Sequence, residues 1–146
     1  MTYLLDSNVV IRLLRGDAGL LARLRAENPD RFGLPVIVLH ELFYGAWRSA
    51  DPARNLARIT ALRFPVLPMD TADARMAAEL RAALARAGTP IGAYDVLIAG
   101  QALARDLTVL THNVREFARV PGLRVEDWEA ATYPCLRTSR PASPCR

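Results

Sequence analysis

The sequence contains no lysine, and its two cysteines, Cys135 and Cys145, both lie close to the C-terminus. All 19 basic residues are therefore arginines, and with 15 acidic residues they give a formal net charge of +4. An arginine-only set can arise from codon bias, but guanidinium groups also suit phosphate, so a nucleic-acid partner is permitted. Two cysteines in a Pro- and Ser-rich segment make neither a disulfide framework nor a zinc site, which favours a reduced, cytoplasmic protein.

Long apolar runs are also missing. No run approaches the roughly 20 residues that span a bilayer, and the N-terminus lacks the basic segment and cleavage site of a secretory signal. Neither G-x-x-x-x-G-K nor G-x-G-x-x-G occurs, which removes the common phosphate-binding loops. The 146 residues, 51% hydrophobic and 23% charged, have the composition of one globular domain with no membrane partner.

Short strand-like runs alternate with helical patterns along the chain. We expect strands at 3–5, 35–39, 65–69, 107–111 and 123–128, and helices at 7–16, 18–27, 40–50, 51–64, 70–88 and 93–106. Ser7 or Asn8 is expected to cap the first helix and Gly16 to end it, and Gly88 is expected to end the helix at 70–88. Asp51 and Pro52 are expected to be the N-cap and first residue of the helix at 51–64. Strands separated by helices imply right-handed crossovers and an α/β fold with a parallel sheet. Residues 1–132 form the expected domain, and 133–146, rich in Pro, Ser and Arg, an expected disordered tail.

Acidic residues fall where strands end or helices begin. Asp6 ends the first strand, Glu41 follows 35–39, Glu116 follows 107–111, and Asp95 lies near the start of a helix. Each acid alone can be a cap, a first-turn helix residue or a solvated charge. Ligands of an open parallel sheet bind at the carboxyl ends of its strands, so these acids should converge. Converging carboxylates repel one another, and a divalent cation such as Mg²⁺ or Mn²⁺ is the usual reason to hold them together.

Two histidines lie beside these acids in the sequence. His40 precedes Glu41, and His112 lies four residues before Glu116. Either could be a metal ligand or a proton shuttle, but a role in the core or on the surface is favoured for both. The domain body contains no cysteine that could act as a nucleophile.

Four segments together resemble one known family. "YLLDSNVVI", "HELFYGA", "PIGAYDVLIAGQAL" and "LTVLTHNVREFARVPGLRVEDW" are similar, in this order and spacing, to the PIN-domain ribonucleases. They look most like the VapC toxins of bacterial toxin–antitoxin pairs, from Met1 to about Trp128. The resemblance implies a PIN-like α/β/α sandwich with a central parallel sheet. It also implies Mg²⁺- or Mn²⁺-dependent endonucleolytic cleavage of RNA, with tRNA as the leading target, a homodimer and a VapB-type antitoxin.

The resemblance assigns roles residue by residue. The catalytic acids would be Asp6, Glu41, Asp95 and Glu116, of which Asp6 and Asp95 hold the metal. Ser7, Thr111 and Asn113 would support them; many PIN proteins have an acid at Asn113, whereas VapC-like members with Asn there place the acid three residues later. His112 replaces the more usual Asn. The residues expected to grip the RNA backbone are Arg12, Arg15, Arg48 and Arg115.

The antitoxin would cover an apolar groove near the N-terminal helices and offer an Arg to the acids. Candidate groove residues are Leu20, Leu21, Leu24, Phe43 and Trp47, each of which could equally fill the core. Tyr44 or Trp47 could stack on a base, but a core or interface role is favoured.

Three other interpretations remain open. A DNA- or flap-directed nuclease would share the fold and the metal chemistry. A catalytically impaired PIN-fold protein could bind nucleic acid or regulate without cleaving it. A metal-dependent phosphatase is disfavoured, because Asp6 is followed by Ser7 and Asn8 rather than by a second Asp two residues on.

Overall fold

A five-stranded, all-parallel sheet forms the centre of the computed structural model, which describes residues 1–129. The strands lie in the order β3-β2-β1-β4-β5. They are β1 (Tyr3–Leu5), β2 (Phe32–Pro35), β3 (Val66–Leu67), β4 (Thr108–Leu110) and β5 (Val125–Glu126). The chain therefore builds outward from β1 in one direction, then crosses back to place β4 on the other side of β1. This confirms the α/β fold with a parallel sheet.

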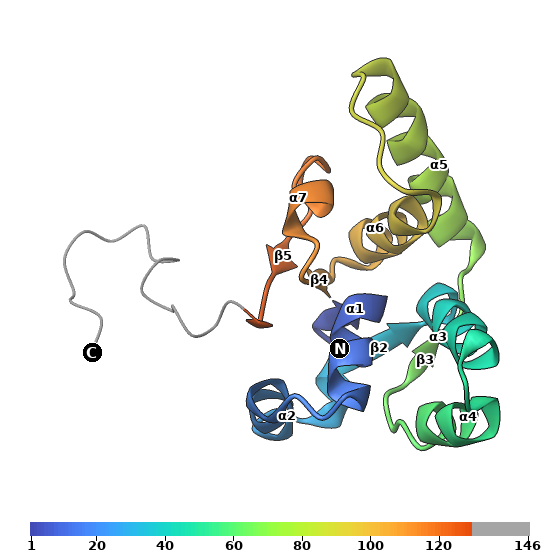
Figure 1. Ribbon diagram of the computed structural model, residues 1–146. Coiled ribbons are helices and arrows are strands. Elements are labelled where there is room, and N and C mark those ends of the chain that lie inside the picture. Colours follow the sequence, from blue (N-terminus) through green and yellow to red (C-terminus); the bar gives the residue numbers. More distant parts are fainter. Residues whose placement is uncertain (130–146) are drawn as a thin grey trace.

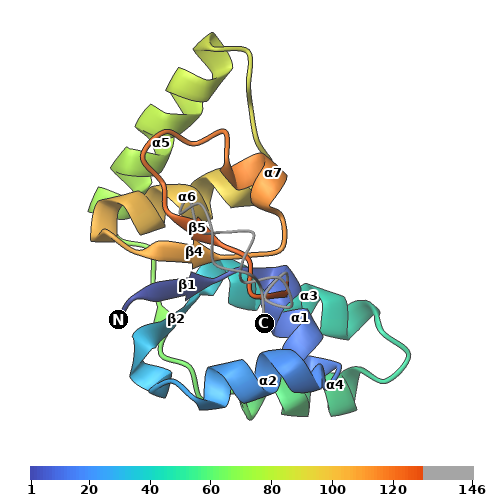
Figure 2. The ribbon, with the colours of Figure 1, turned by 90° about the vertical axis from the view of Figure 1, so that its left-hand side faces the viewer.

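Helices surround this sheet (Figure 1). They are α1 (Ser7–Leu14), α2 (Ala18–Arg25), α3 (Val36–Arg48), α4 (Pro52–Thr60), α5 (Thr71–Arg86), α6 (Ala93–Arg105) and α7 (Val114–Phe117), with a 3₁₀ turn at Pro29–Arg31. In both ribbon views α5 and α6 lie above the strands and α2 and α4 below them (Figures 1 and 2). The strands run toward the side on which α1, α3 and α7 lie (Figure 2), so the carboxyl ends of β1 and β4 face these three helices.

The expected strand at 35–39 is wrong. Strand β2 ends at Pro35, and the β-branched run that follows, Val36–Leu39, is the first turn of α3. Consequently Glu41 is not in the first turn of a helix that starts at residue 40 but lies in the second turn of α3. The short helix α7 was not expected, and Asp6 rather than Ser7 or Asn8 caps α1.

Other local expectations are confirmed. Gly16 and Gly88 follow the C-caps of α1 and α5 with φ values of +81° and +71°, a conformation that costs glycine little. Asp51 caps α4 with Pro52 at its first position. The expected tail at 133–146 and the domain end at 132 lie outside the described residues. None of the helices in residues 1–129 is long and apolar enough to cross a membrane.

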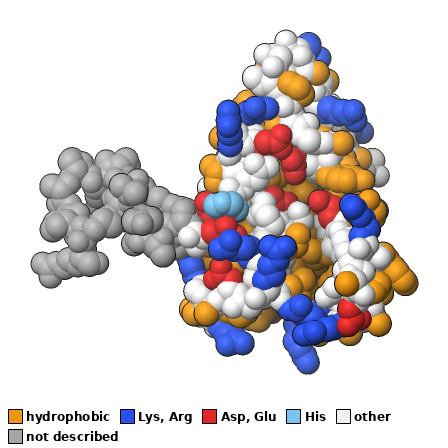
Figure 3. All heavy atoms as spheres, viewed as in Figure 1, with side chains coloured by type: hydrophobic (Ala, Val, Ile, Leu, Met, Phe, Trp, Pro, Cys, Tyr) orange, Lys and Arg blue, Asp and Glu red, His pale blue; other side chains and the backbone are white. Residues whose placement is uncertain are grey.

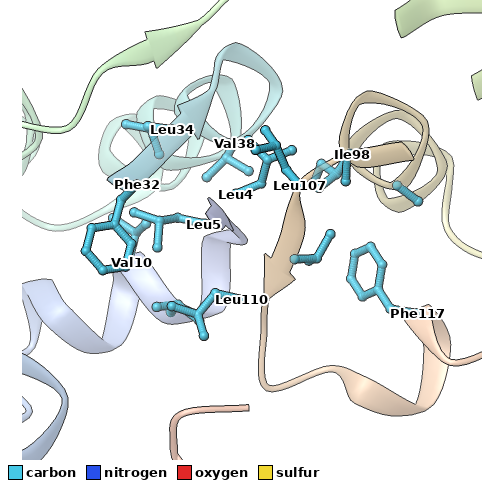
Figure 4. Packing of buried hydrophobic residues seen from close by; sticks show 14 of the residues in the cluster. Leu4, Leu5, Val10, Phe32, Leu34, Val38, Ile98, Leu107, Leu110 and Phe117 are labelled. Carbon is cyan, nitrogen blue, oxygen red and sulfur yellow. The ribbon is translucent and has the colours of Figure 1, made fainter. Parts of the chain in front are cut away.

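The apolar core lies on both faces of β1. Leu4 and Leu5 are fully buried, and because side chains alternate along a strand they point to opposite faces. Figure 4 shows Leu5 beside Val10 of α1, and Leu4 beside Val38 of α3. The core thus holds the carboxyl end of β1 rigidly between helices, which fixes the position of Asp6.

Helices α5 and α6 pack closely against each other above the strands. A Cβ atom on Gly100 of α6 would lie 2.5 Å from the Cα of Ala77, so only glycine allows this packing. Beside it Asp73 is fully buried and accepts hydrogen bonds from Arg105 at 2.7 Å and 3.1 Å. Gln101 also donates to Asp73, at 3.3 Å. These contacts fix α6, and with it Asp95, against α5.

Candidate active site

Asp6 lies where β1 ends and α1 begins. Its backbone N–H continues the sheet by donating to the carbonyl of Leu110 (3.0 Å), and its carboxylate caps α1 by accepting from the Ser7 N–H (2.8 Å). The residue is only 2% exposed. Burial raises the pKa of Asp6, and the hydrogen bonds from Thr111, Ser7 and Asn8 partly oppose that rise. A buried carboxylate at a strand end is thus held in one orientation.

A polar network joins Asp6 to the end of β4. The Thr111 hydroxyl donates to Asp6 Oδ2 (2.7 Å) and accepts from the Asn113 N–H (2.9 Å). The Asn8 side-chain amide donates to the same Asp6 oxygen (3.1 Å) and to the Thr111 hydroxyl (3.2 Å). The Asn8 side-chain oxygen Oδ1 accepts from the His112 backbone N–H (3.0 Å). Thr111 therefore contacts Asp6 directly, and Asn8, which sequence reasoning treated only as a cap, belongs to the same network.

Glu41 reaches the site from α3. Its Oε2 accepts from the Ser7 hydroxyl at 3.4 Å, which places Ser7 between the two carboxylates as expected. Its Oε1 is buried and has no hydrogen-bond partner among the described residues. Burial raises the pKa of Glu41, and the negative charge of Asp6 raises it further.

Asp95 and Glu116 form a proton-sharing pair. Burial raises the pKa of Asp95 to about 7, helped by a hydrogen bond to Glu116 and by the nearby charges of Asp6, Glu116 and Glu41. The pKa of Glu116 is lowered, first by that hydrogen bond and also by donors from Gly92 and Asn113. Asn113 donates to Glu116 Oε2 at 3.4 Å. The structure thus brings the fourth expected acid into contact with the third, and Asn113 orients it.

Gly92, directly before α6, lies against this pair. A Cβ atom there would lie 2.8 Å from Asp95 Oδ2 and 3.7 Å from Glu116 Oε2. We expect Gly92→Ala to push the Asp95 carboxylate aside and to lower RNA cleavage about a hundredfold, because small misplacements of reacting groups are costly. The backbone φ of −56° suits alanine, so thermal denaturation should show little change in stability.

Gly45→Ala in α3 is the matched control, because a Cβ atom there meets nothing within 4 Å. A Gly92→Ala variant that cleaves like wild type would contradict the close contact seen here.

The donor set fits a divalent cation. One carboxylate follows β1 and the others come from α3, α6 and α7, and their negative charges raise the pKa values of Glu41 and Asp95. A buried Glu41 oxygen has no hydrogen-bond donor among the described residues. All-oxygen sets of this kind suit hard divalent ions. Figure 3 shows acidic side chains near the middle of the face viewed in Figure 1, with basic side chains to either side.

Comparisons with known proteins identify the family. The PIN domain family model matches residues 3–123. The chain is 42% identical over 130 residues to the tRNA(fMet)-specific endonuclease VapC of Salmonella typhimurium, covering 88% of this chain and 98% of that one. The enzyme of the same name from Shigella flexneri is 40% identical over the same shares. The chain belongs to the PIN-domain family, among the VapC ribonucleases.

The fold agrees with this membership. The crystal structure of DNA-bound VapBC from Salmonella typhimurium matches with a TM-score of 0.84 at 43% identity, covering 88% of this chain and 98% of that one. The PIN-like α/β/α arrangement expected from the resemblance is thereby confirmed.

The four arginines expected to bind RNA differ in their surroundings. Arg12 forms ion pairs with Asp17 (3.0 Å) and Glu129 (3.3 Å). The guanidinium of Arg48 lies 5.4 Å from the ring of Tyr44. Arg15 lines a groove that includes Glu41, and Arg115 is exposed on α7 beside Glu116. Arg15 and Arg115 are therefore the better placed of the four.

His112 takes part in a cluster that the sequence did not suggest. Its Nδ1 lies 2.9 Å from Glu129 Oε2 and 3.3 Å from Asp127 Oδ2. One ligand-type atom from each of the three residues lies within 4.8 Å of the others. Arg12 lies 3.3 Å from Glu129 Oε1 and also pairs with Asp17, so one guanidinium is shared between an acid of the cluster and an acid outside it. The cluster holds the end of the described chain beside the network around Asp6.

Two apolar hollows adjoin the N-terminal helices. One, of about 320 Å³, lies among α1, α3 and α4; its lining includes Ile11, Leu14, Leu42, Ile59, Arg15, Arg58 and Glu41. The other, of about 340 Å³, includes Leu21 and Leu24, two of the expected groove residues. Leu20 is buried in the core, Phe43 is half-buried, and Trp47 is exposed. Tyr44 and Trp47 are 57% and 68% exposed, so neither ring is in the core, and of the expected core or interface role only the interface role stays a prediction.

Proposed function

We propose that this chain is the toxin of a VapBC-type pair, a metal-dependent endoribonuclease that hydrolyses RNA and thereby inhibits translation in the cytoplasm. The observation that carries the proposal is the meeting of Asp6, Glu41, Asp95 and Glu116 at the carboxyl end of a parallel sheet. Membership among the VapC ribonucleases supports the same reaction.

Asp6 and Asp95 would hold Mg²⁺ or Mn²⁺, with Glu41 and Glu116 contacting it directly or through water. A divalent ion supplies a Lewis acid for the phosphodiester and activates water for attack. Thr111 and Asn8 keep Asp6 fixed, and Asn113 keeps Glu116 fixed, so the acids need no rearrangement when substrate binds. With water as the nucleophile, the products should carry 5′-phosphate and 3′-hydroxyl ends.

We propose tRNA as the substrate, because two relatives of 42% and 40% identity are named tRNA(fMet)-specific endonucleases. We propose that a VapB-type antitoxin occupies the hollow lined by Leu14, Leu42 and Ile59, where a basic residue of the antitoxin could reach Glu41. A VapBC complex is the structure matched at a TM-score of 0.84. The exposed rings of Tyr44 and Trp47 on α3 support a homodimer.

The test is cleavage of total bacterial RNA, purified tRNA and matched DNA by the purified chain in Mg²⁺, in Mn²⁺ and in EDTA, with the fragment ends mapped. Discrete, metal-dependent RNA products with 5′-phosphate ends are expected. Cleavage of DNA alone would favour the flap- or DNA-directed nuclease, and metal-dependent binding without cleavage would favour the impaired protein.

Cation affinity should depend on pH through Asp95. Its raised pKa of about 7 means that the metal-free chain holds a proton on Asp95 below neutrality, and that proton must leave before a cation binds. We expect the apparent Kd for Mn²⁺ to fall about tenfold from pH 6 to pH 8, with proton release on binding. Titration calorimetry in buffers of different ionisation enthalpy measures both quantities. Affinity that is flat across this range, without proton release, would contradict the protonated Asp95.

A further inference from the structure

An aromatic pair flanks two of the acids. The rings of His40 and Tyr94 lie 5.8 Å apart between centroids and 70° apart between planes, an edge-to-face contact. His40 directly precedes Glu41 on α3, and Tyr94 directly precedes Asp95 on α6. Neighbouring residues on a helix point about 100° apart, so each ring projects to one side of the acid that follows it. The pair therefore joins α3 to α6 at the rim of the acidic site.

Both rings remain accessible. Tyr94 is 48% exposed and His40 is exposed, although they contact each other. An aromatic ring that only packed two helices together would be expected to bury most of its surface.

An aromatic ring beside the carboxylates offers a contact for an RNA base that the charged groups do not. The acids and the cation they would hold act on the phosphate and provide no surface for a neighbouring base, so the base needs a contact of another kind. Arg12 and Arg48 each already contact another side chain of this protein. A ring face can hold any base by stacking, and proteins that bind single-stranded RNA use this contact widely.

We propose that His40 and Tyr94 form a stacking corner that holds the base next to the cleaved phosphate, the base lying on one ring with its edge against the other. This inference rests on the proposed ribonuclease function and extends it to how the substrate is held. Tyr94 would be a substrate-binding residue, and its phenol hydroxyl would not be required.

Steady-state cleavage of whichever RNA the assay on total RNA and tRNA identifies as substrate tests the proposal, with Tyr94→Leu and Tyr94→Phe as a matched pair. Leucine keeps the bulk without an aromatic face, whereas phenylalanine keeps the face without the hydroxyl. Loss of one base–ring stack is worth about 1–3 kcal/mol, so Tyr94→Leu should raise KM about 5- to 150-fold. Tyr94→Phe should stay within about twofold of wild type, and His40→Ala should raise KM by less than Tyr94→Leu.

A direct readout uses a short RNA with 2-aminopurine next to the mapped cleavage position, bound to chains that also carry Asp6→Asn to prevent turnover. Binding should quench 2-aminopurine fluorescence with Tyr94 or Phe present and not with Leu. The mass of each variant is measured by light scattering, because a change in mass would report a contact between copies of the chain.

Each outcome decides between distinct alternatives. Equal KM for Tyr94→Leu and wild type, or equal losses for Leu and Phe, would overturn the stacking corner. A change in molecular mass confined to Tyr94→Leu would overturn it in favour of a contact between copies. A wild-type chain that cleaves no RNA would refute the proposed function itself, a result separate from all of these.

Discussion

Asp6→Asn and Asp95→Asn should each lower kcat for RNA cleavage about a thousandfold while leaving the protein folded. A bound divalent ion contributes several kcal/mol of transition-state stabilisation, and each 1.4 kcal/mol is a factor of ten in rate. Asparagine is nearly isosteric, and at position 6 it can still cap α1 by accepting from the Ser7 N–H. Neutralising one member of a cluster of acids also relieves repulsion, so the melting temperature of Asp95→Asn should equal or exceed that of wild type.

Asp30→Asn is the control for these variants, because Asp30 is an exposed acid in the 3₁₀ turn between α2 and β2. It should cleave RNA at the wild-type rate. If Asp6→Asn and Asp95→Asn each cleaved RNA at the wild-type rate, neither residue would hold the metal, and this cluster of acids would not explain the activity.

Arg105→Ala should lower the free energy of unfolding by about 3 kcal/mol. Removing one partner of a buried ion pair leaves the other charge uncompensated, which costs about 3–5 kcal/mol. The Asp73 side chain is 1% exposed and that of Arg105 28% exposed. The lower end of the range applies because Asp73 keeps hydrogen bonds to the Asp70 N–H (3.0 Å) and to Gln101. Urea denaturation at pH 7 measures the loss, and Arg81→Ala on the exposed face of α5 should change stability little.

The deficit of Arg105→Ala should depend on pH. Burial acts to raise the pKa of Asp73, but hydrogen bonds from Arg105 and from the Asp70 backbone outweigh it and hold the pKa below its usual value. A lowered pKa in the folded state stabilises the protein above the unfolded pKa of about 4, and this contribution is lost as the pH falls. The difference between wild type and Arg105→Ala should therefore be fully present at pH 7 and shrink below about pH 4. In the Asp73→Asn background, Arg105→Ala should cost much less; equal costs in both backgrounds would contradict the coupling.

The sequence by itself determined the features that depend on near neighbours. Gly16, Gly88 and the Asp51-Pro52 pair marked helix ends because φ preference and capping act within a few residues. The acids at strand ends could be listed from the sequence, since the carboxyl edge of a parallel sheet is one place whatever its register.

The tertiary structure decided which residues continue the sheet. Val36–Leu39 favours a strand by local propensity, yet the sheet takes Phe32–Pro35 instead, with Tyr3 paired to Phe32 and Leu4 to Gly33. A Cβ atom at Gly33 would lie 2.7 Å from Met1 Sδ and 2.8 Å from Leu67 Cδ1, so a larger residue would have to displace these two side chains. The sheet thus contains a glycine although strand propensity disfavours it.

The tertiary structure also decided the fine arrangement of the site. The Thr111–Asp6 hydrogen bond joins residues 105 apart in sequence, and the Asp95–Glu116 pair meets only when α7 folds against the start of α6. The His40–Tyr94 contact likewise requires α3 and α6 to cross beside the acids. Such contacts depend on loop closure and on packing throughout the core. A pattern along the chain reports only which local backbone conformation each segment favours.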